Sequence, residues 1–280
     1  MDDRTAQTDR RTEEVGPLVQ YYDRLASRYD ADRFGNSYGR YVDAQERRVL
    51  CRWLAPFQGG PILDLACGTG RLLDLATHGL DASPAMVRIA QEKHPQKQIR
   101  CAPATEVGEF RTFHEPPLSR PSATLYPRRG ERAGRGARPG RFVAGEHGVS
   151  AEGTTFDAIF CLHLLMHLPP AEIADVLRAC FEELRPGGVM IFDIPSALRR
   201  RLTAFRPVGW HAGTALSLRE IAAMAGPRWR IKATRGILFF PIHRLPPKVR
   251  PLFRPLDDLV GATPLQPLCS YRFCCLQRPQ

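Results

Sequence analysis

The stretch that decides the fold is Ile62-Leu63-Asp64-Leu65-Ala66-Cys67-Gly68-Thr69-Gly70-Arg71. Its first half, residues 62–66, is a short apolar run that follows glycine and proline, the pattern of a buried parallel strand. Its second half is a turn of small residues that leads into a helical stretch over 71–76. Glycine has no Cβ and tolerates a positive φ, and a helix N-terminus presents free N–H groups. The turn therefore predicts close approach of the backbone to a ligand.

Two carboxylates indicate what kind of ligand this turn would accept. Asp64 lies in the strand just before the glycines, and Asp81 ends the next predicted strand, where an acid can accept hydrogen bonds from ribose hydroxyls. A dinucleotide-binding turn has the pattern GxGxxG, which cradles a pyrophosphate. Here the glycines are closer together, and a carboxylate beside them repels phosphate and suits an ammonium. The pattern predicts a ligand with an amine and a ribose but no phosphate, which is the profile of S-adenosylmethionine.

Strands and helices alternate on both sides of this turn. Ser83 and Pro84 are the expected cap and first residue of a helix, and Ser217-Leu218-Arg219-Glu220 is a capping box that opens another over 218–225. Further strands are predicted at 156–162, 189–194, 229–240 and 270–276, and further helices at 20–30, 37–54, 171–184 and 255–260. This order predicts an α/β fold with a doubly wound, mostly parallel sheet. The Pro-rich stretch 241–267 is expected to pack over one end of it.

The pattern stops between residues 107 and 154, where Pro, Arg, Gly and Ser replace the large aliphatic residues. So few apolar side chains cannot offset the entropy of ordering the chain, so we expect a disordered insertion on the surface. An Arg/Gly-rich arm that binds RNA is the functional alternative. An error in gene prediction is a third explanation that the sequence leaves open.

Composition limits the other classes of function. The 280 residues carry a net charge of +11, which we interpret as a solvated basic face because no aromatic residues are interleaved with the arginines to stack on nucleic acid. The eight cysteines show no CxxC pair and no zinc-type spacing with histidine. No apolar run is long enough to span a bilayer. We expect a cytoplasmic protein with reduced thiols, no metal and no membrane span.

Several segments resemble the class I S-adenosylmethionine-dependent methyltransferases. ILDLACGTGR resembles the first motif of that family, GLDASPAMV the second, FDAIFCLHLLMHL the fourth strand with its loop, and LRPGGVMIFDIP the fifth. YYDRLASRYD resembles the N-terminal lid of the branch that methylates quinones and other small molecules. The resemblance implies a Rossmann-like sheet of seven strands whose last hairpin is antiparallel. It further implies a helical lid over 1–55 and a methyltransferase domain over 56–280, interrupted at 107–154.

The resemblance also implies which residues bind the donor. Asp64, Gly68 and Gly70 would surround its methionine part, and Asp81 would hold the ribose. The adenine would lie against Ala82, Ser83 and Met86. Ala66 stands where the family has its first glycine. The acid that often meets the adenine amine is absent from residues 101–104, with Glu106 as the nearest replacement.

Methyl transfer from a sulfonium is an in-line displacement, so the enzyme mainly aligns two molecules and excludes water, and an oxygen or carbon acceptor also needs a base. His163, just past the fourth strand, is the first candidate, and His167 is the second. Tyr22 would orient the acceptor, and His211 is a weaker candidate for binding it. For His167 and Tyr22 the alternative is a plain packing role.

We therefore expect methylation of a small organic molecule on oxygen, nitrogen or carbon by a monomer or homodimer that uses S-adenosylmethionine. One alternative keeps the chemistry but takes RNA or a protein as acceptor. The other is a catalytically silent scaffold in which Ala66 and the missing adenine acid have abolished donor binding.

Overall fold

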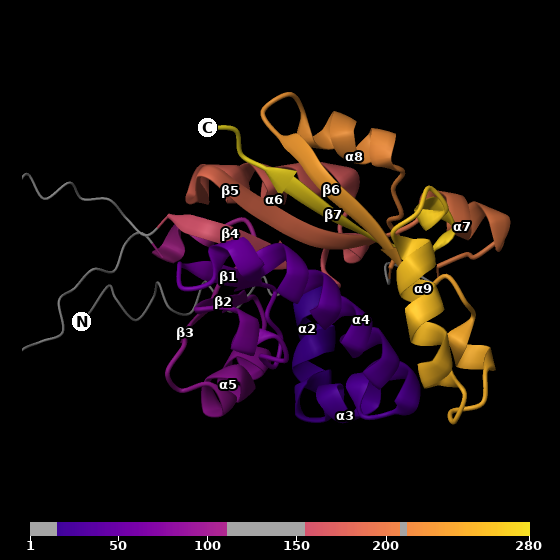
Figure 1. Cartoon of the computed structure of the whole chain (residues 1–280). Coiled ribbons are helices and arrows are strands. Elements are labelled where there is room, and N and C mark those ends of the chain that lie inside the picture. Colours follow the sequence, from indigo (N-terminus) through magenta and orange to yellow (C-terminus); the bar gives the residue numbers. More distant parts are fainter. Residues whose placement is uncertain (1–15, 111–154, 208–211) are drawn as a thin grey trace, which may run out of the picture.

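The computed structural model describes residues 16–110, 155–207 and 212–280, and in these residues seven strands form one sheet in the order β3-β2-β1-β4-β5-β7-β6 (Figure 1). The strands β1 to β5 pair in parallel, and β7 runs antiparallel between β5 and β6. Both the doubly wound sheet and its antiparallel last hairpin are confirmed. The strands are β1 (Ile62–Leu65), β2 (His78–Asp81), β3 (Gln98–Cys101), β4 (Phe156–Cys161), β5 (Leu184–Pro195), β6 (Arg230–Ile237) and β7 (Tyr271–Gln277).

Helices cover both faces of the sheet, and each face has its own apolar core. Alternate residues of β1 point to opposite faces, so Leu63 joins the core under α6 (Pro170–Glu183) and α8 (Leu218–Ala225). Ile62 joins the core under α4 (Ser37–Leu54) and α5 (Pro84–Lys93). Because strands buried on both faces read as near-continuous apolar runs, the sequence showed them clearly.

The predicted helix signals act as expected. Ser83 caps α5 by accepting a hydrogen bond from the Met86 N–H at 3.2 Å. Ser217 and Glu220 form the complete capping box of α8. The predicted helix over 37–54 is confirmed at both ends.

Two predicted helices differ from the structure. The continuous helix expected over 20–30 is divided into α2 (Pro17–Leu25), the 3₁₀ turn η1 (Ala26–Arg28) and α3 (Tyr29–Phe34), and η1 contacts α5. The helical stretch expected over 71–76 is only the 3₁₀ turn η3 (Leu73–Leu75). Too few residues separate Gly70, whose φ is +81°, from β2 for a full α-helix to form.

The start predicted for the insertion is wrong. Val107–Phe110 forms the 3₁₀ turn η4 with both end residues buried, although the sequence analysis assigned the region from 107 to a disordered excursion. The Phe110 ring packs edge-on against His78 at 5.2 Å and against Phe156 at 5.7 Å. Two apolar side chains three residues apart therefore anchor the chain after β3. The rest of the expected insertion, 111–154, lies outside the described residues.

The Pro-rich C-terminal segment packs along β6, the edge strand, and against α4. Its anchor is the fully buried Asp257 of α9 (Arg254–Gly261), which accepts hydrogen bonds from the Tyr41 hydroxyl at 2.8 Å and the Phe239 N–H at 2.9 Å. The helix predicted at 255–260 is thus confirmed. The remaining elements are η2 (Ala55–Phe57), η5 (Leu165–His167), α7 (Ala197–Leu202), η6 (Ile242–Arg244), η7 (Arg250–Phe253) and η8 (Gln266–Leu268).

Candidate active site

The turn after β1 consists of residues in left-handed backbone conformations. Ala66, Gly68 and Gly70 have φ values of +61°, +55° and +81°. A Cβ on Gly68 would meet nothing within 4 Å, whereas one on Gly70 would come within 2.9 Å of the His94 ring. Gly70 therefore serves the packing of the turn, while Gly68 leaves backbone open toward a cavity.

Asp81, at the end of β2, is held by the same turn. Its Oδ2 accepts a hydrogen bond from the Gly68 N–H at 2.8 Å, and its Oδ1 accepts one from the Ser83 N–H at 2.8 Å. Burial raises the pKa of Asp81, and these two backbone donors offset part of the rise. Each oxygen keeps a second lone pair, so an oriented carboxylate can still accept hydrogen bonds from a ligand.

A cavity opens at the carboxyl ends of β1, β2 and β4, the edge where parallel sheets bind ligands. Most of the predicted donor-site residues lie in its wall, which consists of Leu18, Val19, Tyr22, Tyr29, Ala66, Gly68, Leu80, Asp81, Ala82, Ser83, Met86, Ala102, Ala104, Leu162, His163 and Leu164. We call this the donor cavity. Glu106, considered as a replacement for the adenine acid, is not in this wall. The end nearest β3 is apolar, formed by Ala102 and Ala104.

Asp64 lies in a smaller adjoining cavity together with Gly68, Arg71 and His163. Its side chain is 3% exposed, and burial raises the pKa of its carboxyl well above the usual range, with Arg71 acting in the opposite direction. A buried carboxyl that opens on a cavity favours a cationic partner, because such a partner compensates the cost of burying its charge. Asp64 is thus placed as an ammonium ligand would be.

A second cavity, which we call the acceptor cavity after the role that we propose for it, adjoins the first. Its wall is largely aromatic and apolar and is formed by Tyr22, Tyr29, Asp32, Arg33, Phe34, Asn36, Tyr38, Gly39, Val42, His163, Met166, His167, Ala212, Leu238 and Tyr271. Tyr22, Tyr29 and His163 belong to both walls. The structure therefore brings the three predicted catalytic residues, Tyr22, His163 and His167, around one space beside the donor cavity.

His163 lies between two buried carboxylates. Its Nε2 is 2.7 Å from Glu46 Oε1, its Nδ1 is 3.6 Å from Asp193 Oδ2, and its backbone N–H donates to Asp193 Oδ1 at 2.7 Å. Burial alone would lower the pKa of His163, but Glu46 and Asp193 outweigh burial and raise it. The residue also has a φ of +62°, an uncommon conformation outside glycine that the surrounding contacts must hold in place.

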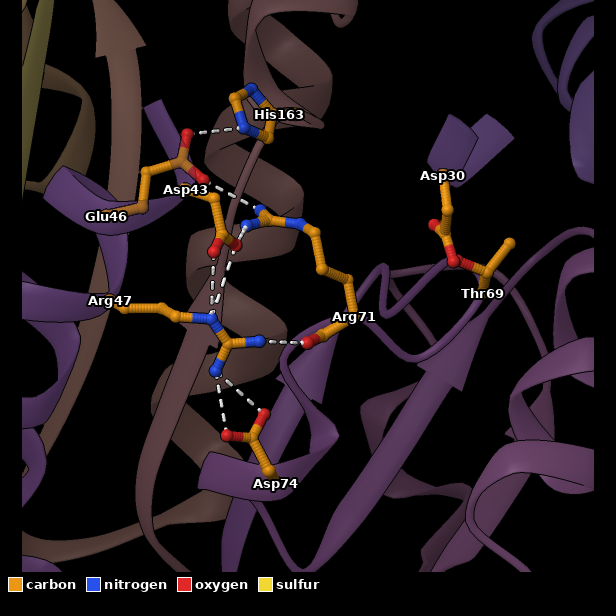
Figure 2. A network of polar contacts seen from close by, with 8 residues as sticks. All are labelled: Asp30, Asp43, Glu46, Arg47, Thr69, Arg71, Asp74 and His163. Atoms are coloured by element: carbon orange, nitrogen blue, oxygen red, sulfur yellow. Dashed lines mark hydrogen bonds and ion pairs between the residues drawn. The ribbon is translucent and has the colours of Figure 1, made fainter. Parts of the chain in front are cut away.

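Glu46 connects His163 to a chain of ion pairs across the base of the site. Figure 2 shows the Glu46 carboxylate reaching both the His163 ring and the Arg71 guanidinium, which is 2.7 Å from Glu46 Oε2. Arg71 also pairs with Asp43, and Arg47 joins Asp43 to Asp74. Burial would raise the pKa of Glu46, but His163 and Arg71 together lower it to about 2. Glu46 therefore stays ionised under ordinary conditions.

Tyr22 and His167 form a second polar contact in the acceptor cavity. The Tyr22 hydroxyl is 3.1 Å from His167 Nε2, and the Ala212 N–H donates to His167 Nδ1 at 3.0 Å. Because Nδ1 accepts that bond, the neutral ring carries its proton on Nε2 and donates it to the Tyr22 oxygen. The hydroxyl proton of Tyr22 is then not used in the contact with His167. Burial raises the pKa of Tyr22, so the phenol stays neutral.

The N-terminal helices are tied to the donor-side loops by two acids. Asp23 of α2 accepts hydrogen bonds from the Ser83 hydroxyl and from the Ala85 N–H, the latter at 3.1 Å. Asp30 of α3 accepts a hydrogen bond from the Thr69 hydroxyl at 2.6 Å and pairs with Lys93. These helices therefore close over the donor cavity, with Tyr22 and Tyr29 pointing into it.

Five residues of the site were not predicted from the sequence: Asp23, Asp30, Glu46, Arg71 and Asp193. Three signals could have found most of them. The dipeptide Tyr-Asp occurs at 22–23 and again seven residues later, at 29–30. Each time the tyrosine lines the cavity and the aspartate binds a loop of the donor side. Glu46 stands on the apolar face of its helix, four residues after Val42. Asp193 lies in an apolar strand, as Asp64 does. His211 lies outside the described residues.

The described residues contain no group of His, Cys, Asp and Glu placed to hold a metal ion. In the described part of the chain, no helix combines the length and apolarity needed to cross a membrane.

Comparison with known proteins agrees with the site. A family model for a methyltransferase domain matches residues 63–190. A demethylmenaquinone methyltransferase from Bacteroides fragilis is 35% identical over 84 residues, which is 27% of this chain. The match spans about a third (34%) of that relative's length.

Solved structures share the fold at low identity. Magnesium protoporphyrin IX methyltransferase from Synechocystis PCC 6803, crystallised with bound S-adenosylhomocysteine, aligns with a TM-score of 0.54 and 13% identity, covering 93% of this chain and 97% of its own. The [4+2]-cyclase SpnF aligns with a TM-score of 0.55 and 14% identity, covering 94% and 95%. The likeness to these structures therefore shows the fold and leaves the reaction open. The family model, the strand order and the glycine turn agree on a class I S-adenosylmethionine-dependent methyltransferase domain that includes residues 63–190 of this chain.

Proposed function

We propose that the protein transfers the methyl group of S-adenosylmethionine to a small organic acceptor with an ionisable hydroxyl on a planar ring. The observation that carries this proposal is the common wall of the two cavities, where Tyr22, Tyr29 and His163 face both. A donor in one cavity and an acceptor in the other would meet at these three side chains. We also propose that residues 1–55 act as the lid and 56–280 as the catalytic domain.

The residues present fit S-adenosylmethionine. Asp64 would pair with its ammonium, the open backbone at Gly68 would adjoin its methionine part, and Asp81 would accept the ribose hydroxyls. Ala82, Ser83 and Met86, opposite the apolar Ala102 and Ala104, would line the adenine. When bound, this donor supplies an electrophilic methyl group on a sulfonium. The protein then needs to align the acceptor with that methyl and keep water out.

The nature of the acceptor follows from the groups that face it. Tyr22 offers a hydroxyl proton, because His167 already donates to its oxygen. The His163 ring is held protonated, but its charge is balanced by the ionised Glu46, and both its ring nitrogens face carboxylates. An ionised phenol or enol oxygen can accept the proton of Tyr22. Such an acceptor attacks without losing a proton in the transition state, so we assign the base to neither histidine, and the base roles predicted for them stay predictions.

The wall of the acceptor cavity supports a planar ring. Tyr29, Phe34, His163 and Tyr271 follow one another at ring-centroid distances of 6.1, 6.4 and 6.3 Å, in edge or tilted contacts. Flat aromatic surfaces favour a flat ligand. The demethylmenaquinone methyltransferase among the relatives, whose name gives a quinone as acceptor, supports a planar ring.

Calorimetric titration with S-adenosylmethionine, followed by transfer of a radiolabelled methyl group to a panel of phenols, quinols, amines and carboxylic acids, tests the proposal. We expect the donor to bind, Asp81→Ala to lose at least tenfold in affinity, and Asp74→Ala, at an exposed acid of the ion-pair chain, to bind as the parent does. Label should appear on phenols or quinols. Donor binding with label on amines alone would overturn the acceptor class.

The two alternatives from the sequence predict other outcomes. An RNA or protein methyltransferase would label a polymer and leave every small molecule unlabelled. A silent scaffold would not bind the donor at all, in the parent as in Asp81→Ala.

A further inference from the structure

The exposed face of α9 is apolar, and its buried face carries an acid. Leu252, Leu256 and Leu259 follow each other at helical spacing along η7 and α9 and are 75%, 46% and 63% exposed. Asp257, on the opposite side, is fully buried. This arrangement inverts the usual pattern of a surface helix, in which the apolar stripe faces the core. The stripe therefore lacks a role in holding the domain together.

Nearly all the large exposed apolar side chains of the described residues lie at this end of the molecule. Leu202 in α7 and Phe205 just after it are 65% and 53% exposed, and Leu265 beside η8 is 50% exposed. The segments are joined, because Arg199 of α7 donates to the Leu268 carbonyl at 2.9 Å. Figure 1 shows α7 and α9 at the same end of the molecule. Apolar side chains gathered in this way indicate a binding surface.

The charge around these side chains is positive. Residues 197–206 contain four arginines and no acid, and residues 241–269 contain Arg244, Lys248, Arg250 and Arg254. The two acids of the second segment are not available to a partner: Asp257 is buried, and Asp258 pairs with Arg48. We define the docking face by its exposed apolar residues, Leu202, Phe205, Leu252, Leu256, Leu259 and Leu265, together with the exposed basic residues of these two segments, Arg201, Arg206, Arg244 and Lys248.

We propose that the docking face binds the surface of an anionic lipid bilayer. Apolar side chains that enter the headgroup region, flanked by Lys and Arg, are the two components of peripheral membrane binding. A second copy of the chain fits less well, because a two-fold contact at this face would bring the arginines of both copies together.

The docking face also adjoins the acceptor cavity. His243 of η6 packs edge-on against Tyr38, a wall residue, at 6.3 Å, and Arg250 donates to the Ser37 hydroxyl at 2.7 Å. A bilayer on this face would therefore lie near the wall of the acceptor cavity. Vesicle binding needs neither donor nor acceptor, so the proposal stands apart from the proposed reaction.

Co-sedimentation of the full chain with vesicles tests the proposed membrane binding. The experiment compares vesicles of phosphatidylcholine alone with vesicles of phosphatidylcholine and phosphatidylglycerol at about 0.15 M salt. We expect at least tenfold tighter binding to the anionic vesicles. The combined change Leu252→Ser, Leu256→Ser and Leu259→Ser should lose at least tenfold, as should Arg201→Gln, Arg206→Gln and Lys248→Gln. All six side chains are exposed, so melting curves should match the parent.

The matched control is Leu218→Ser with Arg219→Gln on α8, which pairs an exposed leucine with an exposed arginine away from the docking face. It should bind as the parent does. Equal binding to both vesicle types, no binding to either, or full binding by the leucine variant would overturn the proposal. The proposal would also be overturned if the parent protein formed a dimer and did not bind vesicles, and if the leucine substitutions dissociated that dimer. Binding of a single-stranded RNA oligonucleotide in place of vesicles, unchanged by the leucine substitutions, would also overturn it.

Discussion

The Nε2 atom of His163 lies 2.7 Å from a carboxylate oxygen of Glu46, a residue 117 positions earlier in the chain, and both side chains are largely removed from water. This contact joins α4 to the loop after β4 at the common wall of the two cavities. It means that α4, inside the segment expected to be a lid, supplies part of the floor of the site. The same contact makes the stability of the fold depend on the charge of the site.

Glu46→Gln should lower the free energy of unfolding by about 3–5 kcal/mol, because it leaves His163 and Arg71 buried without their shared carboxylate. The matched change Asp74→Asn, at the 54% exposed end of the same ion-pair chain, should cost under about 1 kcal/mol. Urea unfolding of both variants measures the difference. Equal and small losses would show that Glu46 is dispensable to the fold.

Stability should fall as the pH rises above the ordinary pKa of histidine. The pKa of His163 is raised from 6.5, so its stabilising charge is fully present below 6.5 and is lost as the pH rises through its folded-state pKa. The pKa of Glu46 is lowered from 4.5 to about 2, so its contribution is present above 4.5 and is lost as the pH falls toward 2. Stability should therefore be greatest between these limits.

Urea unfolding across this range checks the prediction. His163→Asn should flatten the alkaline slope, and asparagine is chosen because it tolerates a positive φ better than most residues. His243→Asn, at an exposed histidine, should keep the slope of the parent. A variant of His163 with an unchanged alkaline slope would assign the effect to other groups.

Ala66→Gly should raise the free energy of unfolding by about 1 kcal/mol, since alanine at a φ of +61° carries a Cβ penalty that glycine avoids. The same change at Ala222, inside α8, should lower it by about 1 kcal/mol. Donor affinity should not fall in Ala66→Gly. A destabilised Ala66→Gly would mean that the methyl group contributes more by packing than it costs in backbone strain.

The sequence predicted most of the sheet because its strands are buried on both faces and read as apolar runs, and because Ser83 and Ser217 mark helix starts by side-chain chemistry. The prediction from the sequence was wrong where tertiary packing determines the local structure. Val107 and Phe110 sit in a segment of loop-like composition, yet two side chains entering the core are enough to order it. The 3₁₀ break at Ala26–Arg28 likewise depends on contact with α5.

The residues of the site also fall into a group that could be predicted from the sequence and a group that could not. Asp64, Gly68 and Asp81 follow from a local motif, so their positions could be predicted. The partners of His163 could not, because Glu46 and Asp193 reach it from elements 117 and 30 residues away. The sequence therefore marked His163 as a candidate without indicating that two carboxylates surround it, and these two carboxylates argue against His163 as a free base.

Release of the donor should depend on Asp30. In the segment proposed as the lid, Leu18, Val19, Tyr22 and Tyr29 line the donor cavity, so we expect a bound donor to leave when these residues move aside. Asp30→Ala removes the bonds to Thr69 and Lys93 and should speed dissociation of labelled S-adenosylmethionine several-fold. Asp32→Ala on the same helix, where the acid pairs with Arg28 of the same segment, is the matched control and should leave the rate unchanged. Equal rates of donor dissociation in the two variants would mean that the contacts of Asp30 do not keep the donor bound.

Tyr22→Phe should lower kcat/KM by about 10- to 100-fold, the range expected for one hydrogen bond to a charged oxygen, and leave donor affinity nearly unchanged. His167→Ala should lower it through Tyr22, because it removes the donor that orients the hydroxyl. If the two residues act as one unit, the double variant is no slower than Tyr22→Phe alone. The control is Tyr21→Phe, because Tyr21 is not among the residues that form the two cavity walls. This variant should keep the parent's activity. Additive losses would instead mean that His167 contacts the acceptor independently, which would restore it as a candidate base.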